Sequence, residues 1–568
     1  MDTNVRTGPP TARTVLTGAV TGQARHVVTS AALNAAHQGG EALIPVLIGV
    51  VIDRAVGQGG PVDLLLWIGV VAVMFAALST GFRYGARSGE RAAEQAAHQL
   101  RIGVARRVLD DRGGAEHRHL PGALASIATS DAERVGMVNL ALAAGTGALA
   151  GLLVGGTALL VVSIPLGLLV LVGAPLLLWL AQLLGRPLEH RSSTEQEHAA
   201  YASGLAADLV AGLRVLKGLG AAPAAADRYR LASRHSLAAT VRAARARAWH
   251  DGILLVATGL FVAAVGLLGG RLATQGEISV GQLVAAVGLA LFLLGPLSTV
   301  SWVNAEFAQG RASAARIATV LGAPPATTGG ADHPADPVRG QLALYDVRHG
   351  TLRGVSLHAA PGELLGIVAP DPVTAADLLR CLAREVDPEA GRIDLDGVPL
   401  ATLDPGRLRA AILVAPHEAD LFEGSLLDNV TAAASAPAAV APALAAADVA
   451  EVARALPDGV RTRLAERGRS LSGGQRQRVA LARALAAGTP VLVLHDPTTA
   501  VDAATEARIA DGVRRLRRGS TTLLVTTSPA LLAVTDRVVL LEAGVVRADG
   551  RHPDLLRDDT GYRTAVLT

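Results

Sequence analysis

Six separate runs of about 20 mostly apolar residues constrain the fold of this 568-residue chain more than any other feature, because a helix of roughly that length crosses the hydrocarbon core of a membrane. Half of the chain is apolar, in keeping with such a design. The runs lie near 26–56, 63–84, 137–162, 165–184, 252–270 and 281–303. The region 1–321 is therefore predicted to form an α-helical transmembrane domain with six spans.

Arginine is concentrated in two long loops, which follow the second span and precede the fifth. Positive charge marks the cytoplasmic side of a membrane protein. The long loops, both termini and the C-terminal domain are thus predicted to be cytoplasmic, in a multi-pass protein of a bacterial-type plasma (inner) membrane. The long loops are expected to extend the spans as helices. Only Ser163 and Ile164 separate the third and fourth spans, so that turn must be tight.

The composition changes at GAPPATTGGADHPADPVRG, which predicts a Pro/Gly-rich linker over 322–340. Beyond it, over 341–568, short apolar runs such as ELLGIVA, AAILVA, PVLVLH and TTLLVTT alternate with helical patterns. This alternation is typical of an α/β domain with a largely parallel sheet. An Ala-rich stretch near 436–456 is predicted to be an inserted helical subdomain.

The overall charge and the cysteine content narrow the choice of function. A net charge of +3 is too small to indicate a nucleic-acid partner. The single cysteine, Cys381, excludes an intrachain disulfide and gives no redox or metal motif.

The string LSGGQ, Leu471 to Gln475, is the most specific motif in the chain. Gly473 and Gly474 at a helix start would let backbone amides approach a phosphate, and the Ser472 hydroxyl would add a donor. A capped helix start without a ligand is the alternative, because serine is a good N-cap. The flanking strings AERG and QRVALARAL favour phosphate binding.

Together with VIDRAV, SDAERV, LRVLKGLGA and ASAARI, this motif makes the chain resemble one half of an ATP-binding cassette (ABC) exporter. The resemblance covers nearly the whole chain and implies a P-loop-like nucleotide-binding domain after the six spans. It also implies that two such domains dimerise head to tail. Each ATP, with its Mg²⁺, then lies between one chain's phosphate loop and the other chain's LSGGQ.

Two cytoplasmic segments, LPGALASIATSD and GLRVLKGLGAA, resemble the coupling helices that press on the nucleotide-binding domains. Lys217, the only lysine in the chain, lies in the second segment. A contact of Lys217 with solvent or a lipid headgroup is at least as good an interpretation as a specific contact.

The phosphate loop of that family, GxxxxGK[ST], aligns here with Ala369 to Ala376. Ala375 replaces the lysine, Ala376 replaces the hydroxyl that binds magnesium, and both glycines are missing. Two prolines remove amide donors. Asp371 and Asp377 add negative charge where a triphosphate would lie. The loop is therefore predicted not to hold ATP in the usual way.

The other catalytic positions of the family are also replaced. His495 stands where an aspartate would hold magnesium, and histidine is a poor ligand for this hard cation. Asp496 replaces the catalytic glutamate and is one methylene shorter, His417 replaces a glutamine, and Thr527 replaces the switch histidine. The aromatic residue that stacks on adenine has no clear counterpart, with His349 only a weak candidate. No metal site is predicted, since His417 and His495 lie on separate segments without a further ligand at metal-binding spacing.

An intact LSGGQ beside these losses predicts a heterodimer. Leu471 to Gln475 would complete the ATP site of a second ABC half-transporter that has an intact phosphate loop and a catalytic glutamate. Asp502 would lie at the dimer seam and help to couple the two sites. This chain alone is expected to be catalytically inactive. A homodimer would have no competent site.

Polar residues of the first span are candidates for the translocation path of a small or amphipathic solute. Asn34, His37, Gln38 and Glu41 recur at helical spacing, which predicts that they share one face. Ionisable groups at membrane depth usually face the bundle interior or water and avoid contact with lipid. An interior polar pair that only helps helices to associate is the alternative.

Two further functions stay open beside that of a heterodimeric exporter. One is an importer of a chelated metal or siderophore with the exporter architecture. The other is a regulatory membrane protein of ABC architecture that transports nothing.

Overall fold

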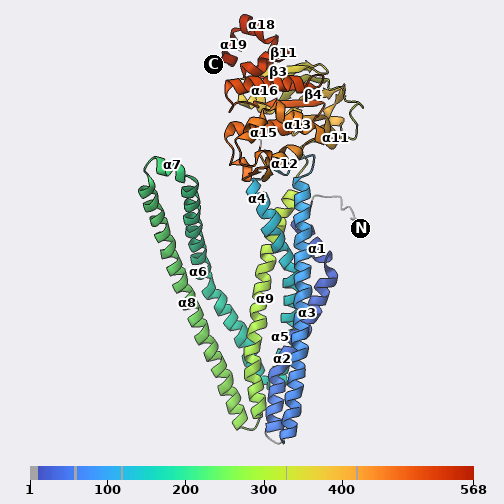
Figure 1. Ribbon diagram of the computed structural model, residues 1–568. Coiled ribbons are helices and arrows are strands. Elements are labelled where there is room, and N and C mark those ends of the chain that lie inside the picture. Colours follow the sequence, from blue (N-terminus) through green and yellow to red (C-terminus); the bar gives the residue numbers. More distant parts are fainter. Residues whose placement is uncertain (1–9, 57–59, 117–118, 328, 418–419, 568) are drawn as a thin grey trace. The chain divides into compact units, whose positions relative to one another are not determined.

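The computed structural model describes residues 10–56, 60–116, 119–327, 329–417 and 420–567. It divides into two compact units (Figure 1). The first unit contains Met1–Ala105 and Pro121–Gly322, and the second contains Arg106–Leu120 and Ala323–Thr568. The predicted division at 321 and 341 stays a prediction.

The first unit is built of long α-helices. Its helices are α1 Ala12–Thr21, α2 Ala24–Val51, α3 Pro61–Val108, α4 Pro121–Ser126, α5 Ala132–Val162, α6 Ile164–Ala211, α7 Leu213–Gly218, α8 Ala222–Thr274 and α9 Val280–Leu321, with π-helical turns at Ile52–Val56 and Ile127–Asp131. Among the described residues, six helices are long and apolar enough to cross a membrane, which confirms the six predicted spans.

Local sequence explains where several of these helices begin. Ser163 alone separates α5 from α6, and its extended backbone makes the tight turn that was expected there. Ser279 begins α9 with a capping box, in which its hydroxyl and the side chain of Gln282 exchange bonds with backbone amides. Helix α1 was not predicted, although Thr11 and Thr14 form the same kind of cap.

Small residues let the helices of the first unit pack closely. Helix α5 packs along α2 and α9, and α6 packs along α8. A Cβ atom added at Gly281 of α9 would lie 2.0 Å from the carbonyl oxygen of Gly49 in α2, so these two backbones touch. Asp53 reinforces the contact, because its carboxylate accepts a bond from Gly281 N at 2.9 Å and another from the Ser279 hydroxyl.

The second unit contains the predicted α/β domain. Its main sheet has the strand order β12-β11-β3-β10-β9-β6 and is parallel except at β12, as predicted for a largely parallel core. The strands are β3 Leu364–Val368, β6 Ile412–Ala415, β9 Val491–His495, β10 Thr521–Val525, β11 Arg537–Glu542 and β12 Val545–Gly550.

Smaller sheets and the helices complete the second unit. An antiparallel sheet of order β2-β1-β4-β5 and a two-stranded sheet of β7 and β8 accompany the main sheet. The strands are β1 Leu342–His349, β2 Leu352–Ala359, β4 Ala390–Leu395, β5 Val398–Pro399, β7 Gly424–Ser425 and β8 Arg463–Leu464. The α-helices are α10 Pro372–Leu382, α11 Pro405–Ala411, α12 Leu426–Thr431, α13 Pro437–Ala446, α14 Val449–Arg454, α15 Gly473–Ala486, α16 Ala503–Leu516, α17 Pro529–Ala533, α18 His552–Asp558 and α19 Thr560–Leu567. Helices α13 and α14 lie within 436–456, the stretch predicted as a helical subdomain.

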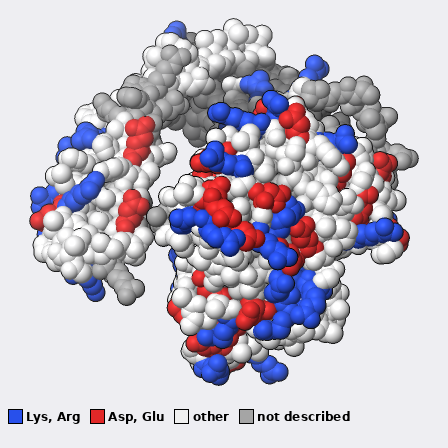
Figure 2. Space-filling view, turned by 90° about the horizontal axis from the view of Figure 1, so that it is seen from above, with Lys and Arg blue, Asp and Glu red and all other residues white. Residues whose placement is uncertain are grey.

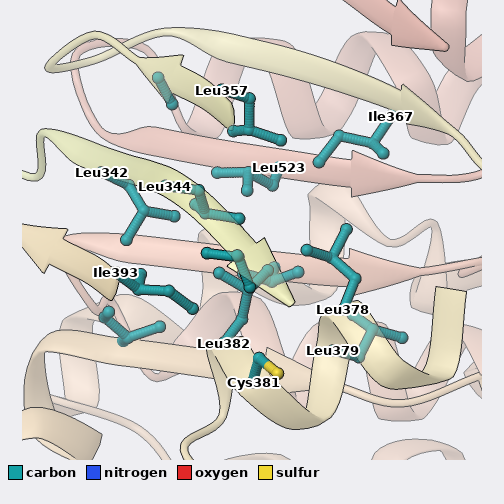
Figure 3. Packing of buried hydrophobic residues seen from close by; sticks show 14 of the residues in the cluster. Leu342, Leu344, Leu357, Ile367, Leu378, Leu379, Cys381, Leu382, Ile393 and Leu523 are labelled. Atoms are coloured by element: carbon teal, nitrogen blue, oxygen red, sulfur yellow. The ribbon is translucent and has the colours of Figure 1, made fainter. Parts of the chain in front are cut away.

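A hydrophobic core holds α10 between the two larger sheets (Figure 3). Leu378 and Leu382 of α10 point toward Leu344 of β1 and Leu523 of β10, and all four are nearly inaccessible to solvent. The core therefore fixes the start of α10, which follows the phosphate-loop position.

A loop from the first half of the chain belongs to the second unit. Asp111 forms an ion pair with Arg409 of α11 at 2.5 Å, and the carbonyl oxygen of Arg112 accepts a bond from Ala326 N at 3.0 Å. The loop after α3 and part of the predicted linker are thus joined to the α/β domain.

Figure 2 shows basic and acidic side chains interspersed over the viewed face.

Candidate nucleotide site and signature helix

The phosphate-loop position is closed by one of its own side chains. Asp371 is the N-cap of α10, and its carboxylate accepts bonds from Val373 N at 3.1 Å, Thr374 N at 3.2 Å and Thr374 Oγ1 at 2.7 Å. These amides are the ones that a helix N-terminus offers to a phosphate. The bonds from the Thr374 hydroxyl and from the amides hold the pKa of Asp371 below its usual value, so the carboxylate is ionised at neutral pH.

A tight hairpin turn also packs against α10. Asp377, which is nearly buried, accepts bonds from Thr351 N at 2.8 Å and Thr351 Oγ1 at 3.0 Å. A Cβ atom at Gly350 would lie 2.3 Å from Asp377 Oδ2. Strands β1 and β2 pair directly from His349 to Leu352, so only two residues form the turn. The segment expected to carry an adenine-stacking aromatic is thus short, and the ring of His349 lies beside Glu389 instead.

The residues at the acidic motif lie at the carboxyl end of β9. The rings of His417 and His495 are 5.8 Å apart, and His495 Nε2 lies 3.7 Å from Asp496 Oδ2. Burial lowers the pKa of His495 despite the neighbouring Asp496 carboxylate, so its ring is neutral at pH 7. Among the described residues, no group of three or more His, Cys, Asp or Glu side chains could hold a metal ion.

The LSGGQ motif begins helix α15. Ser472 is the N-cap, its hydroxyl accepts a bond from Gln475 N at 3.3 Å, and the Gln475 side chain accepts a bond from Ser472 N at 2.9 Å. A Cβ atom at Gly474 would lie 2.4 Å from the carbonyl oxygen of Ala500, so only glycine fits there. Leu471 is buried and anchors the motif to the domain.

A basic cleft opens beside Gly473. It has a volume of about 450 Å³, and its lining includes three arginines, Arg467, Arg469 and Arg476, and one acidic residue, Asp420. Two of these side chains, Arg467 and Arg469, are exposed. Positive charge next to a helix N-terminus is an arrangement that attracts phosphate.

Two other predicted positions lie on the segments that follow β9 and β10. Asp502 is exposed and caps α16, where it accepts a bond from Thr505 N at 3.0 Å. Thr527 is exposed on the loop after β10, between Thr526 and Ser528. Sequence reasoning missed Gln477 and Glu506, which connect these segments. The signal for Gln477 was its position one turn after Gly473 on the same helix.

The polar residues of the first span contact two neighbouring helices. His37 Nδ1 lies 3.0 Å from the Leu78 carbonyl oxygen in α3, and His37 Nε2 lies 3.5 Å from Glu41 Oε2. Asn34 donates to the Ser30 carbonyl oxygen at 2.9 Å. A Cβ atom at Gly151 of α5 would lie 3.3 Å from Gln38 Oε1, which is buried and unpartnered among the described residues. Their role in a translocation path stays a prediction.

Comparison with known proteins agrees with this architecture. Residues 27–297 match the family described as ABC transporter transmembrane region, and residues 352–499 match the ABC transporter family. A bacterial Atm1-family ABC exporter with ATP bound has a similar fold, with a TM-score of 0.75 over 96% of this chain and 98% of that one, at 23% identity.

Two curated relatives have comparable sequences. A multidrug efflux ATP-binding/permease protein of Mycobacterium bovis is 31% identical over 455 residues, which are 79% of this chain but 38% of the relative. An ATP-dependent lipid A-core flippase of Thiobacillus denitrificans is 29% identical over 70% of each chain. The fold is thus a six-span membrane domain followed by an ABC nucleotide-binding domain. The chain belongs to the ABC transporters and is a multi-pass membrane protein with the exporter fold.

Proposed function

We propose that this chain is the non-catalytic half of a heterodimeric, ATP-driven membrane transporter. Its own phosphate-loop site would not hold ATP and Mg²⁺, and its LSGGQ would complete the site of a partner half-transporter. The observation that carries this proposal is the hydrogen bonding of Asp371 to Val373 N and Thr374 N. An ionised carboxylate occupies these amides, and its negative charge repels a phosphate group.

Two further features support the loss of the site. The two-residue turn at Gly350 and Thr351 contains no aromatic residue, and the Asp377 carboxylate is bonded to that turn. No lysine exists in the nucleotide-binding domain to contact the β- and γ-phosphates.

The signature helix has the features of a competent phosphate contact. Ser472 and the following glycines begin α15 with their N-terminal amides, and the basic cleft lies beside them. A motif without a role would be expected to lose its sequence together with the phosphate loop. We infer that LSGGQ acts on ATP held by another chain, with Asp502 near the seam between the two domains.

Nucleotide binding to each subunit tests the proposal directly. The full chain would be purified with its partner through a tag on this chain, and the complex labelled with a photoreactive ATP analogue. We expect the label on the partner's phosphate loop and on the α15 region of this chain, with none on 364–382. Strong labelling of 364–382 would contradict the proposal.

The transported substrate is proposed from chemistry and from the relatives. Six apolar spans with a polar group at His37 and Glu41 suit an amphipathic solute, and the relatives are named for multidrug efflux and for lipid A-core flipping. We propose export of a small or amphipathic solute from the cytoplasmic side of the inner membrane. ATP-dependent accumulation inside inverted membrane vesicles would support export, and ATP-dependent depletion would indicate import instead.

A further inference from the structure

Gln477 joins the signature helix to the segment that follows β9. It lies on α15, one turn beyond Gly473. Its Nε2 donates to Thr499 Oγ1 at 2.8 Å, and its Oε1 accepts a bond from Ala500 N at 2.9 Å. Both groups of one amide are thus used to fix the segment 497–502 against the helix.

Glu506 continues the connection from that segment to the loop after β10. Its Oε1 accepts bonds from Thr498 Oγ1 at 2.6 Å and from Ser528 Oγ at 2.8 Å. Ser528 directly follows Thr527, the switch position of this chain's own site. Hydrogen bonds therefore run from the signature helix through 497–502 to the loop that carries Thr527.

Close packing makes this connection stiff. Gly474 meets the Ala500 carbonyl oxygen so closely that a Cβ atom would be 2.4 Å away. Val501 N donates to the Thr498 carbonyl oxygen at 3.0 Å and closes a turn inside the segment. A shift of the segment along α15 would break both bonds of Gln477 at once.

We propose that Gln477 and Glu506 are positioning residues that set the orientation of LSGGQ toward the ATP of the partner. The inference rests on the proposed function, because only a motif acting in trans needs such an orientation. Gln477 also lines the basic cleft beside Gly473, whereas Glu506 is not part of that lining. Both side chains act through the segment before Asp502, which they bond to directly. With no nucleotide in this chain's own site to order the loops, these two side chains hold them in one arrangement.

Paired substitutions separate a positioning role from a structural one. Gln477→Leu and Glu506→Leu remove the hydrogen bonds at nearly constant volume. Gln477→Glu and Glu506→Gln are the matched controls. A carboxylate introduced at position 477 accepts from both Ala500 N and the Thr499 hydroxyl, and an amide oxygen introduced at position 506 still accepts. Each variant would be purified as the complete complex, and its ATP hydrolysis and melting temperature measured.

We expect the two leucine variants to lower kcat about tenfold or more at saturating ATP, because small misplacements are costly in catalysis. Their melting temperatures should stay close to wild type, and the matched controls should keep at least about a third of kcat. The double leucine variant should be little worse than either single one, because both act in the same chain of bonds.

Three outcomes would overturn the inference. The first is an unchanged kcat in Gln477→Leu. The second is a fall in kcat that is matched by a fall in melting temperature, and the third is a fall in kcat that also occurs in the matched controls. A parallel Ser472→Asp variant distinguishes this failure from that of the proposed function. If Ser472→Asp abolishes hydrolysis while Gln477→Leu does not, LSGGQ acts in trans without this positioning. If Ser472→Asp has no effect, the proposed function itself fails.

Discussion

Asp371 and Thr374 form a closed hydrogen-bonded pair at the start of α10, in which the carboxylate accepts from both the backbone amide and the hydroxyl of Thr374. In the family, a lysine and a magnesium-binding hydroxyl follow at the next two positions, here Ala375 and Ala376. The pair therefore lies directly before two of the positions at which this sequence departs from the family's phosphate loop.

Restoring the phosphate loop should require the removal of Asp371. We expect the full chain with Ala375→Lys and Ala376→Ser to bind a fluorescent ATP analogue no better than wild type, since the carboxylate still occupies the amides. Adding Asp371→Ser and Thr374→Gly should raise the affinity about tenfold or more, because the helix N-terminus becomes free for phosphate. Tight binding by the first variant alone would show that the carboxylate is no obstacle.

Substitutions of Ser472 should separate helix capping from phosphate contact. Ser472→Asp keeps a good N-cap, so the melting temperature should change little, but its charge should repel phosphate and abolish hydrolysis by the complex. Ser472→Ala should cost about 1 kcal/mol of stability by losing the cap. Thermal unfolding and ATPase assays on the same preparations provide the measurement. Equal activity of Ser472→Asp and wild type would exclude a role in trans.

The stability of the nucleotide-binding domain should fall as the pH is lowered through 6.5. Burial depresses the pKa of His495 in the folded protein, so below its ordinary value the unfolded chain binds a proton that the folded chain does not. The contribution of His495 to the free energy of unfolding is fully present above pH 6.5. It is lost as the pH falls from 6.5 toward the lower pKa of the folded state. His495→Asn should reduce the slope of stability against pH by up to about one proton. Denaturant unfolding between pH 5 and 8 measures this slope, and an unchanged slope would contradict the assignment to His495.

Residues His37 and Glu41 should affect transport more than folding if they line the path. We expect His37→Ala and Glu41→Ala to leave expression and melting temperature close to wild type while abolishing the stimulation of ATP hydrolysis by substrate. His37→Gln is a useful comparison, because it keeps a hydrogen-bonding group near the Leu78 carbonyl oxygen. A large fall in melting temperature with normal stimulation in the remaining protein would favour the helix-association alternative.

Most of the fold could be predicted because its signals are local. The six apolar runs required spanning helices, and the apolar strings that became β3, β6, β9 and β10 required a buried parallel sheet. Helix α1 escaped prediction, since its ten residues are too few and too weakly apolar to stand out. The attachment of Asp111 to Arg409 was equally invisible, because 298 residues separate the partners.

The sequence by itself determined which chemical groups are present: the LSGGQ motif, and the missing lysine, glycines and magnesium ligands at 369–376. The residue at each position decides which chemical groups are present, because folding cannot supply a side chain that is absent. Only the tertiary structure decided what the remaining groups do. It brought Asp377 to Thr351, and Gln477 and Glu506 to the segment before Asp502. Hydrogen bonds between distant segments depend on how strands and helices pack, and no local pattern records them.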